Sequence, residues 1–206
     1  IMNLSKGRMG EINANLIGGM LITKIYLAAM SRANLQDAQV RALPNFYFYV
    51  DEFQSFVNDT FKDILSEARK YKLNLTIAHQ YIEQMPEEVR NAVFGNVGTT
   101  IAFRVGPFDA EVLEKIFEPQ FMAQDLINLG FAQIYLTLMI DGIGSQPFSA
   151  TTLPPIFPPT KSYRENIIAH SRATYALTKD KVEEQIREWY QPVKVEKKYE
   201  RMEERR

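Results

Sequence analysis

Two adjacent carboxylates, Asp51 and Glu52, directly follow an unbroken run of apolar and aromatic residues at 46–50. Such a run is typical of a strand that is buried on both faces of a parallel sheet. Side chains alternate along a strand and splay at its end, so the two acids can take separate tasks. The first is suited to hold Mg²⁺, which prefers oxygen ligands and keeps several waters. The second is suited to activate a water molecule as a general base.

A neutral amide follows the next predicted strand, where residues 73–78 end at His79 and Gln80. Beside a terminal phosphate, such an amide can orient the attacking water or sense the loss of phosphate. Each candidate has a plain structural alternative, which is a solvated turn for the acid pair and an ordinary loop amide for Gln80. The combination points to nucleotide hydrolysis, with Asp51 as the metal ligand and Glu52 and Gln80 as catalytic candidates.

Two arginines are candidates for stabilising the charge that develops on a transferred phosphate. Arg69 lies on the polar face of a predicted helix, from which it could reach a phosphate held by a neighbouring subunit. Its alternative is a solvated helix face. Arg104 lies near the end of another predicted strand, and its alternative is a structural pair with Asp109 or Glu111.

Strands and helices alternate over the first half of the chain. The predicted strands are 1–4, 46–50, 73–78 and 98–106, the predicted helices are 11–33, 58–72, 86–96 and 107–117, and residues 33–45 are a predicted connector. This alternation predicts an α/β domain with a mainly parallel sheet flanked by helices. Ligands of such sheets bind beyond the carboxyl ends of the strands, where the acid pair, His79–Gln80 and Arg104 are expected to converge.

The later part of the chain predicts two further strands, at 132–141 and 145–153, joined by a turn. A proline-rich stretch at 154–160 then marks a domain edge. We therefore predict a motor-type domain at 1–153, a linker at 154–160, a helical appendage at 161–193 and a charged tail at 194–206. The appendage is a helical cap or, alternatively, a partner-binding element.

Composition is that of an ordinary globular protein. The 206 residues are 46% hydrophobic and 24% charged, with a formal net charge of −1. Any nucleic-acid contact must therefore be a local patch, and "ARKYK" at 68–72 is the candidate. Cysteine is absent, which excludes disulfides and thiolate metal sites. The apolar residues 14–30 are interrupted by Lys24, so we predict a buried helix and no membrane-spanning segment.

Four segments together resemble a known family: "FYVDEFQSF", "ILSEARKYKLNLTIAHQY", "FGNVGTTIAFRVG" and "MIDGIGSQPFSATTLPP". They are similar, in order and spacing over residues 1–160, to the motor domain of TraG- and TraD-type coupling ATPases of conjugative type IV secretion systems. Those enzymes belong to the HerA/FtsK group of ring-shaped P-loop DNA motors. The resemblance implies a RecA-like fold that binds ATP and Mg²⁺.

The resemblance also implies roles for single residues. Asp51 and Glu52 match the Walker B acids, and Gln80 matches the sensor at the end of the following strand. Arg69 falls where the family places an arginine finger that acts across a subunit boundary, and Arg104 is a second candidate for that task. Implied partners are DNA, identical subunits in a hexameric ring, and secretion or relaxosome proteins.

One family feature is missing, because the sequence contains no phosphate loop of the form G-x-x-x-x-G-K-[ST]. The nearest glycine cluster, "KGRMGE", lacks the lysine followed by Ser or Thr. We therefore expect a C-terminal portion of a longer motor that is inactive alone. Its expected location is cytoplasmic, at the inner face of the inner membrane, held by an anchor that precedes Ile1.

The leading hypothesis is thus part of an ATP-driven DNA translocase. One alternative is a non-catalytic interaction module, in which the acids are structural. The other is an ATPase of the same superfamily with a different cargo.

Overall fold

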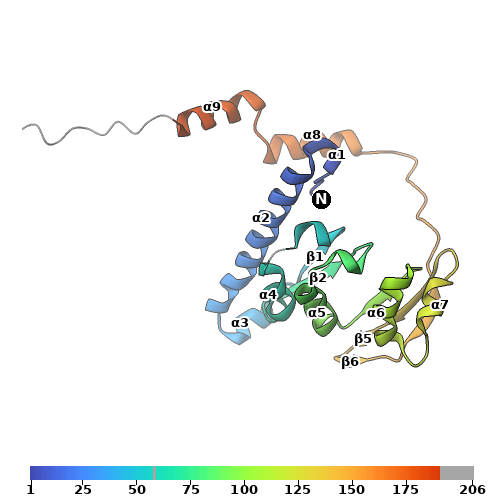
Figure 1. The fold of residues 1–206 in the computed structure, drawn as a ribbon. Helices are drawn as coiled ribbons and strands as arrows, with labels where there is room; N and C mark the ends of the chain where they lie inside the picture. Colours follow the sequence, from blue (N-terminus) through green and yellow to red (C-terminus); the bar gives the residue numbers. More distant parts are fainter. Residues whose placement is uncertain (58, 191–206) are drawn as a thin grey trace, which may run out of the picture. The chain divides into compact units, whose positions relative to one another are not determined.

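The computed structural model describes residues 1–57 and 59–190. The chain divides into two units, Ile1–Leu153 and Pro154–Arg206, which are described separately. Elements are labelled in Figure 1. The predicted charged tail, 194–206, lies outside the described residues.

Two parallel strands form the centre of the first unit. Strand β1, Phe46–Val50, pairs along its whole length with β2, Leu73–Ile77. The connection between them runs through the 3-10 helix η2 (Phe53–Phe56), helix α4 (Asp59–Glu67) and the 3-10 helix η3 (Ala68–Tyr71). Both predicted strands are confirmed, and parallel pairing brings their carboxyl ends to one edge.

Strand β1 buries one face only. Val50 is buried and Phe48 is half-buried, whereas Tyr47 and Tyr49 on the other face are 62% and 71% exposed. The prediction of burial on both faces is therefore wrong for the described residues. The aromatic run has the composition of a doubly buried strand, but a composition does not show which face receives a packing partner.

A second sheet is antiparallel. Its strand order is β3 (Thr100–Ala102), β4 (Gln133–Thr137) and β7 (Phe148–Thr151). The expectation that 98–106 extends the parallel sheet is thus wrong, because β3 pairs with the later strand β4. Between β4 and β7 lies a hairpin of β5 (Met139–Ile140) and β6 (Ile143–Gly144). Asp141 and Gly142 at its tip both have positive φ, which suits a tight hairpin turn.

Helices pack around these sheets and build the core. Helix α5 (Glu87–Asn96) and helix α6 (Pro107–Phe117) agree with the predicted helices, and shorter elements are η4 (Ile82–Gln84) and α7 (Ala123–Ile127). The largest fully buried side chains come from five different elements: Phe53, Phe61, Ile82, Phe117 and Leu126.

The N-terminal region is helical. It contains α1 (Lys6–Met9), α2 (Glu11–Met30), the 3-10 helix η1 (Ser31–Asn34) and α3 (Asp37–Ala42). The predicted strand at 1–4 is wrong, since among the described residues no strand pairs with it. The predicted connector 33–45 contains α3, whose start is stabilised by a capping box between Gln36 and Gln39.

Helix α2 carries two apolar stripes on opposite sides. The buried stripe is Ala14, Gly18, Ile22 and Ala29, and the exposed one is Ile12, Leu16, Met20 and Leu27. The expectation of a mostly buried helix is therefore wrong in this structure. By length and composition alone, Glu11–Asn34 could cross a membrane, a test that core helices of soluble proteins also pass.

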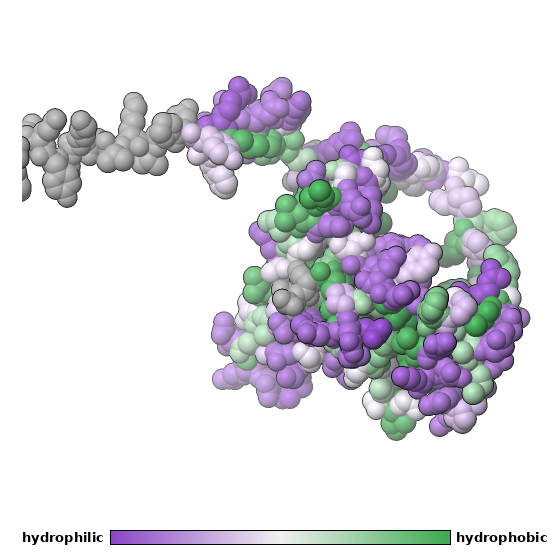
Figure 2. Space-filling view, viewed as in Figure 1, coloured by the Kyte–Doolittle hydropathy of each residue, from purple (hydrophilic) through white to green (hydrophobic). Residues whose placement is uncertain are grey.

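The second unit contains α8 (Arg164–Tyr175) and α9 (Lys179–Trp189), which confirms a helical C-terminal region. Neither helix has a buried residue. In Figure 2, α9 shows hydrophilic side chains along one side and hydrophobic ones along the other. Val182 and Ile186, one turn apart, contribute to the apolar side.

Candidate functional site

The acid pair lies where β1 ends. Asp51 is exposed, and Glu52 adopts the left-handed conformation with φ 50° and ψ 42°. The Glu52 N–H donates to Oδ1 of Asp51 at 3.0 Å. Phe53, which follows, is fully buried, and its N–H donates to the carbonyl of Ala78 at 3.1 Å. The left-handed backbone conformation costs free energy for any residue other than glycine. Its presence at Glu52 therefore suggests a functional constraint.

The Glu52 carboxylate accepts hydrogen bonds from two side-chain amides. Gln54 Nε2 donates to Oε2 at 2.7 Å, and Gln80 Nε2 donates to Oε1. Gln80 comes from the loop after β2, so this contact links the carboxyl ends of the two parallel strands. It brings two of the residues singled out in the sequence into direct contact.

A buried acid supports the loop that carries Gln80. Asp109, in the first turn of α6, is only 8% exposed, and its Oδ1 accepts the N–H of Ile82 at 3.2 Å. His79 lies in the same loop, and its ring stacks on Phe53 with centroids 5.4 Å apart. Burial lowers the pKa of His79 below its usual range, and the negative charges of Asp109 and Glu52 oppose that shift.

Neither candidate arginine lies at the acid pair. Arg69 is exposed in η3, which precedes β2, and therefore lies at the opposite end of the parallel strands. Five residues of strand separate the two ends by about 16 Å. Arg104 is exposed beyond β3 in the antiparallel sheet. Within the described residues it makes no ion pair or hydrogen bond with Asp109 or Glu111, so the expected convergence with the acid pair is not seen.

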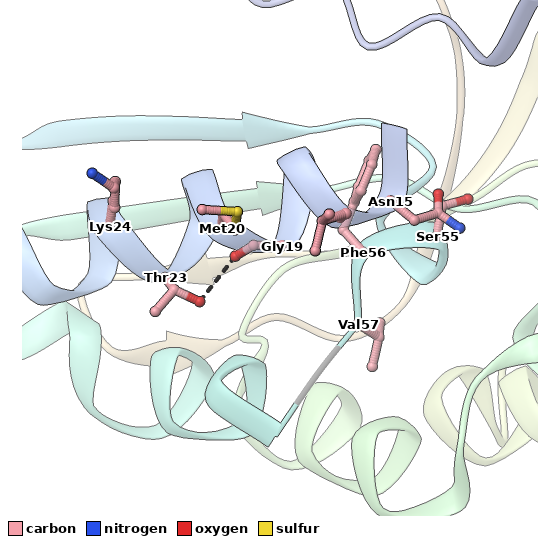
Figure 3. Close-up of a pocket in the computed structure, with 9 residues that line it drawn as sticks. Asn15, Gly19, Met20, Thr23, Lys24, Ser55, Phe56 and Val57 are labelled. Atoms are coloured by element: carbon pink, nitrogen blue, oxygen red, sulfur yellow. Dashed lines mark hydrogen bonds between the residues drawn. The ribbon is translucent and has the colours of Figure 1, made fainter. Parts of the chain in front are cut away.

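A separate apolar pocket of about 590 Å³ lies between α2 and η2. Figure 3 shows it, with Met20, Phe56 and Val57 among the lining side chains and Thr23 bonded to the carbonyl of Gly19 at 2.9 Å. The acid pair and Gln80 do not line it. It lies next to η2, the element that directly follows Glu52.

Residues 45–117 match a family model described as the TraM recognition site of TraD and TraG. This stretch contains the acid pair, Gln80, both arginines and Asp109.

Residues 45–117 are thus similar to a segment of TraD and TraG.

Two solved structures are similar in fold over a longer part of the chain. The plasmid coupling protein TrwB in complex with the ATP analogue ADPNP matches with a TM-score of 0.52 at 12% identity, over 69% of this chain and 38% of that one. TrwB with the GTP analogue GDPNP matches with 0.51 at 13% identity, over 67% and 37%. The RecA-like α/β fold is thereby confirmed, and the chain spans less than two fifths of these structures. No curated protein sequence matches the chain.

The carboxylate oxygens that follow β1 fit an Mg²⁺ ion that keeps its water shell. Asp51 is exposed, and its Oδ2 makes no hydrogen bond within the part of the chain that the structure describes. The described residues contain no cluster of three or more potential ligands among His, Cys, Asp and Glu. A dedicated cage of side chains is therefore absent there, whereas a single carboxylate is what a water-rich Mg²⁺ site next to phosphates requires.

Asp109 has a role that the sequence did not suggest. An acid in the first turn of a helix is usually a solvated partner of the helix dipole. The local signal, Pro107 followed by Asp109, predicts the helix correctly but not the contact with Ile82, which is 27 residues earlier in the chain.

Proposed function

We propose that this chain is part of an ATP-driven motor of a conjugative coupling protein, in which hydrolysis between subunits of a hexameric ring moves DNA. The observation that carries the proposal is the hydrogen bond between Glu52 and Gln80 at the carboxyl ends of two parallel strands. That is the edge at which α/β proteins bind their ligands. The TrwB structures of the same fold hold nucleotide analogues, which supports a nucleotide as the ligand.

Three side chains would divide the chemistry. Asp51 would bind the water shell of Mg²⁺, which when bound offsets negative charge on the phosphates. Glu52 would accept a proton from the attacking water. Each oxygen of Glu52 accepts one amide hydrogen bond and keeps a further lone pair that can take the proton. With its second N–H and its oxygen, the Gln80 amide would orient the water or contact the terminal phosphate.

The remaining parts of the nucleotide site would come from outside this chain. The 206 residues contain no phosphate loop, so the backbone amides and lysine for the phosphates would be supplied by sequence outside them. Arg69 lies at the opposite end of the strands from Glu52, so it would serve a nucleotide bound by a neighbouring subunit. Arg104 is a second candidate for this role. The motor would work on the cytoplasmic side of the membrane.

Recognition of a protein partner is a second candidate function. It is favoured by the description of the matching family as a TraM recognition site. In that case residues 45–117 would bind a relaxosome protein, and the acid pair would be structural. Binding of such a partner with no effect of acid-pair variants on nucleotide turnover would favour it.

Glu52→Gln in the full-length protein tests the leading proposal. We expect this variant to bind ATP with an affinity within about threefold of the wild type, while its turnover falls by at least about 10²-fold, because the general base is lost. Glu83→Gln, an exposed acid in η4, is the matched control and should turn over ATP normally. Normal turnover by Glu52→Gln would remove Glu52 from the chemistry. Residues 1–206 alone should bind ATP weakly and hydrolyse none.

A further inference from the structure

A groove lies at the end of the parallel strands opposite to the acid pair. It is formed by η1, α3 and η3 and has a volume of about 400 Å³. Its position follows from the chain path, because Lys72 links η3 to β2 and the Lys72 carbonyl accepts the N–H of Phe46 at the start of β1. The groove is thus separated from Glu52 by the length of the strands.

Positive charge dominates this groove. Its lining includes four cations and one acid: Arg32, Arg41, Lys70, Lys72 and Asp37. The local net charge of +3 contrasts with the −1 of the whole chain. Among the described residues, the side chains of the two lysines, Arg41 and Asp37 make no ion pair or hydrogen bond. Unpaired like charges gathered in a groove create a positive potential that attracts an anionic ligand.

The backbone holds these cations in place. Arg32 Nη1 donates to the carbonyl of Tyr71 at 2.6 Å, which joins η1 to η3. Lys72 has φ 62°, the left-handed conformation that glycine adopts with least strain at the end of a helix. A lysine in this conformation costs free energy that a glycine would avoid. The backbone turn does not require a charged residue, but the lysine adds a positive charge to the groove lining.

The arrangement suits an extended chain of phosphates better than a compact triphosphate. Triphosphates are commonly held by free backbone N–H groups at a helix N-terminus. Here the start of α3 is occupied by the Gln36–Gln39 capping box, and Asp37 adds a negative charge. The four cations instead come from three separate stretches of the chain, namely η1, α3 and residues 70–72, and Tyr71 adds an aromatic side chain to the lining. Cationic grooves with aromatic side chains are typical of single-strand binding.

We propose that this groove binds the phosphodiester backbone of single-stranded DNA, mainly through Arg41, Lys70 and Lys72. The choice of DNA rests on the proposed function. The site itself is separate from the acid pair, so binding can be measured without nucleotide or hydrolysis. Failure of the DNA-binding test would leave the turnover test of Glu52 unaffected. Failure of the turnover test would likewise leave the DNA-binding test unaffected.

Fluorescence anisotropy of a labelled dT20 oligonucleotide with residues 1–206 tests the proposal. Lys70→Ala/Lys72→Ala should weaken binding at least tenfold. The slope of log affinity against log salt should fall by about 1.4, because each lost phosphate contact on a single strand contributes about 0.7. Lys115→Ala/Lys181→Ala removes the same net charge from exposed positions and should change affinity less than twofold.

Asp37→Asn removes the acid from the groove and should tighten binding by about two- to threefold. A misfolded variant would bind more weakly, so a gain in affinity cannot result from misfolding. Equal losses in the two double-lysine variants would overturn the proposal, as would no binding by the wild type at 50 mM salt. Displacement of the oligonucleotide by ATP at an equal concentration of phosphate groups would show a compact triphosphate site and would also overturn it.

Discussion

The side-chain amide of Gln80 donates a hydrogen bond to Oε1 of Glu52, across the carboxyl ends of two neighbouring parallel strands. Glu52 reaches this position because its backbone is left-handed directly after β1. Gln80 reaches it because the loop after β2 is held from the other side by Asp109 on α6. The geometry of the candidate site therefore depends on a helix that contributes no side chain to the chemistry.

Asp109→Ala is expected to destabilise the first unit by about 1–3 kcal/mol, because the N–H of Ile82 loses its acceptor in a buried setting. Asp109→Asn retains an acceptor oxygen and should recover most of the loss. Chemical denaturation gives the stability, and hydrogen exchange of the Ile82 amide gives the local effect. Glu111→Ala, an exposed acid on the same helix, is the control. Equal effects of Asp109→Ala and Glu111→Ala would contradict the assigned contact.

The pKa of His79 should lie below its usual value of about 6.5, since burial disfavours the imidazolium. The folded state then binds fewer protons than the unfolded state, so this residue contributes stability above pH 6.5 that is lost as the pH falls through the lowered pKa. NMR titration can follow this histidine directly, because the sequence contains only one other, His170.

A charge variant tests the surroundings of His79. Asp109→Asn removes a negative charge that raises the pKa, so the pKa of His79 should fall further. An upward movement of the His79 pKa, or no movement at all, would show that Asp109 does not act on His79 as the structure implies.

Gly18→Ala should destabilise the chain by about 1–3 kcal/mol, because overpacking forces side chains or backbone to shift. A Cβ at this position would lie 2.2 Å from Cδ1 of Phe56 in η2, the element that follows the acid pair. Gly95→Ala is the matched control, since a Cβ there meets no atom within 4 Å, and it should stabilise α5 by about 0.5–1 kcal/mol. Thermal unfolding compares the two. A neutral Gly18→Ala would mean that α2 does not pack this closely on η2.

The sequence predicted the elements whose signals are local. The apolar run before Asp51 predicts β1, and Pro107 at a first helical position predicts the start of α6. What it missed depends on contacts between distant residues. The partner of β3 is β4, more than thirty residues later, so the sheet that carries Arg104 could not be read from its own stretch.

The burial of helix α2 also could not be predicted from its own stretch of sequence. Its apolar residues lie on two opposite stripes, and only packing decides which stripe is buried. The charged groove likewise could not be located, because "ARKYK" supplies only two of its four cations. Arg32 and Arg41 join them through the fold of η1 and α3.

A double-mutant cycle on ATP turnover by the full-length protein tests the central claim that Glu52 and Gln80 act as one unit. The variants are Glu52→Gln, Gln80→Ala and the combination, with Gln84→Ala as an exposed amide control. We predict that each single variant lowers kcat at least about tenfold and that the combination is no slower than Glu52→Gln alone, because residues acting together give non-additive losses. Losses that multiply, or a Gln80→Ala enzyme with wild-type kcat, would contradict the account.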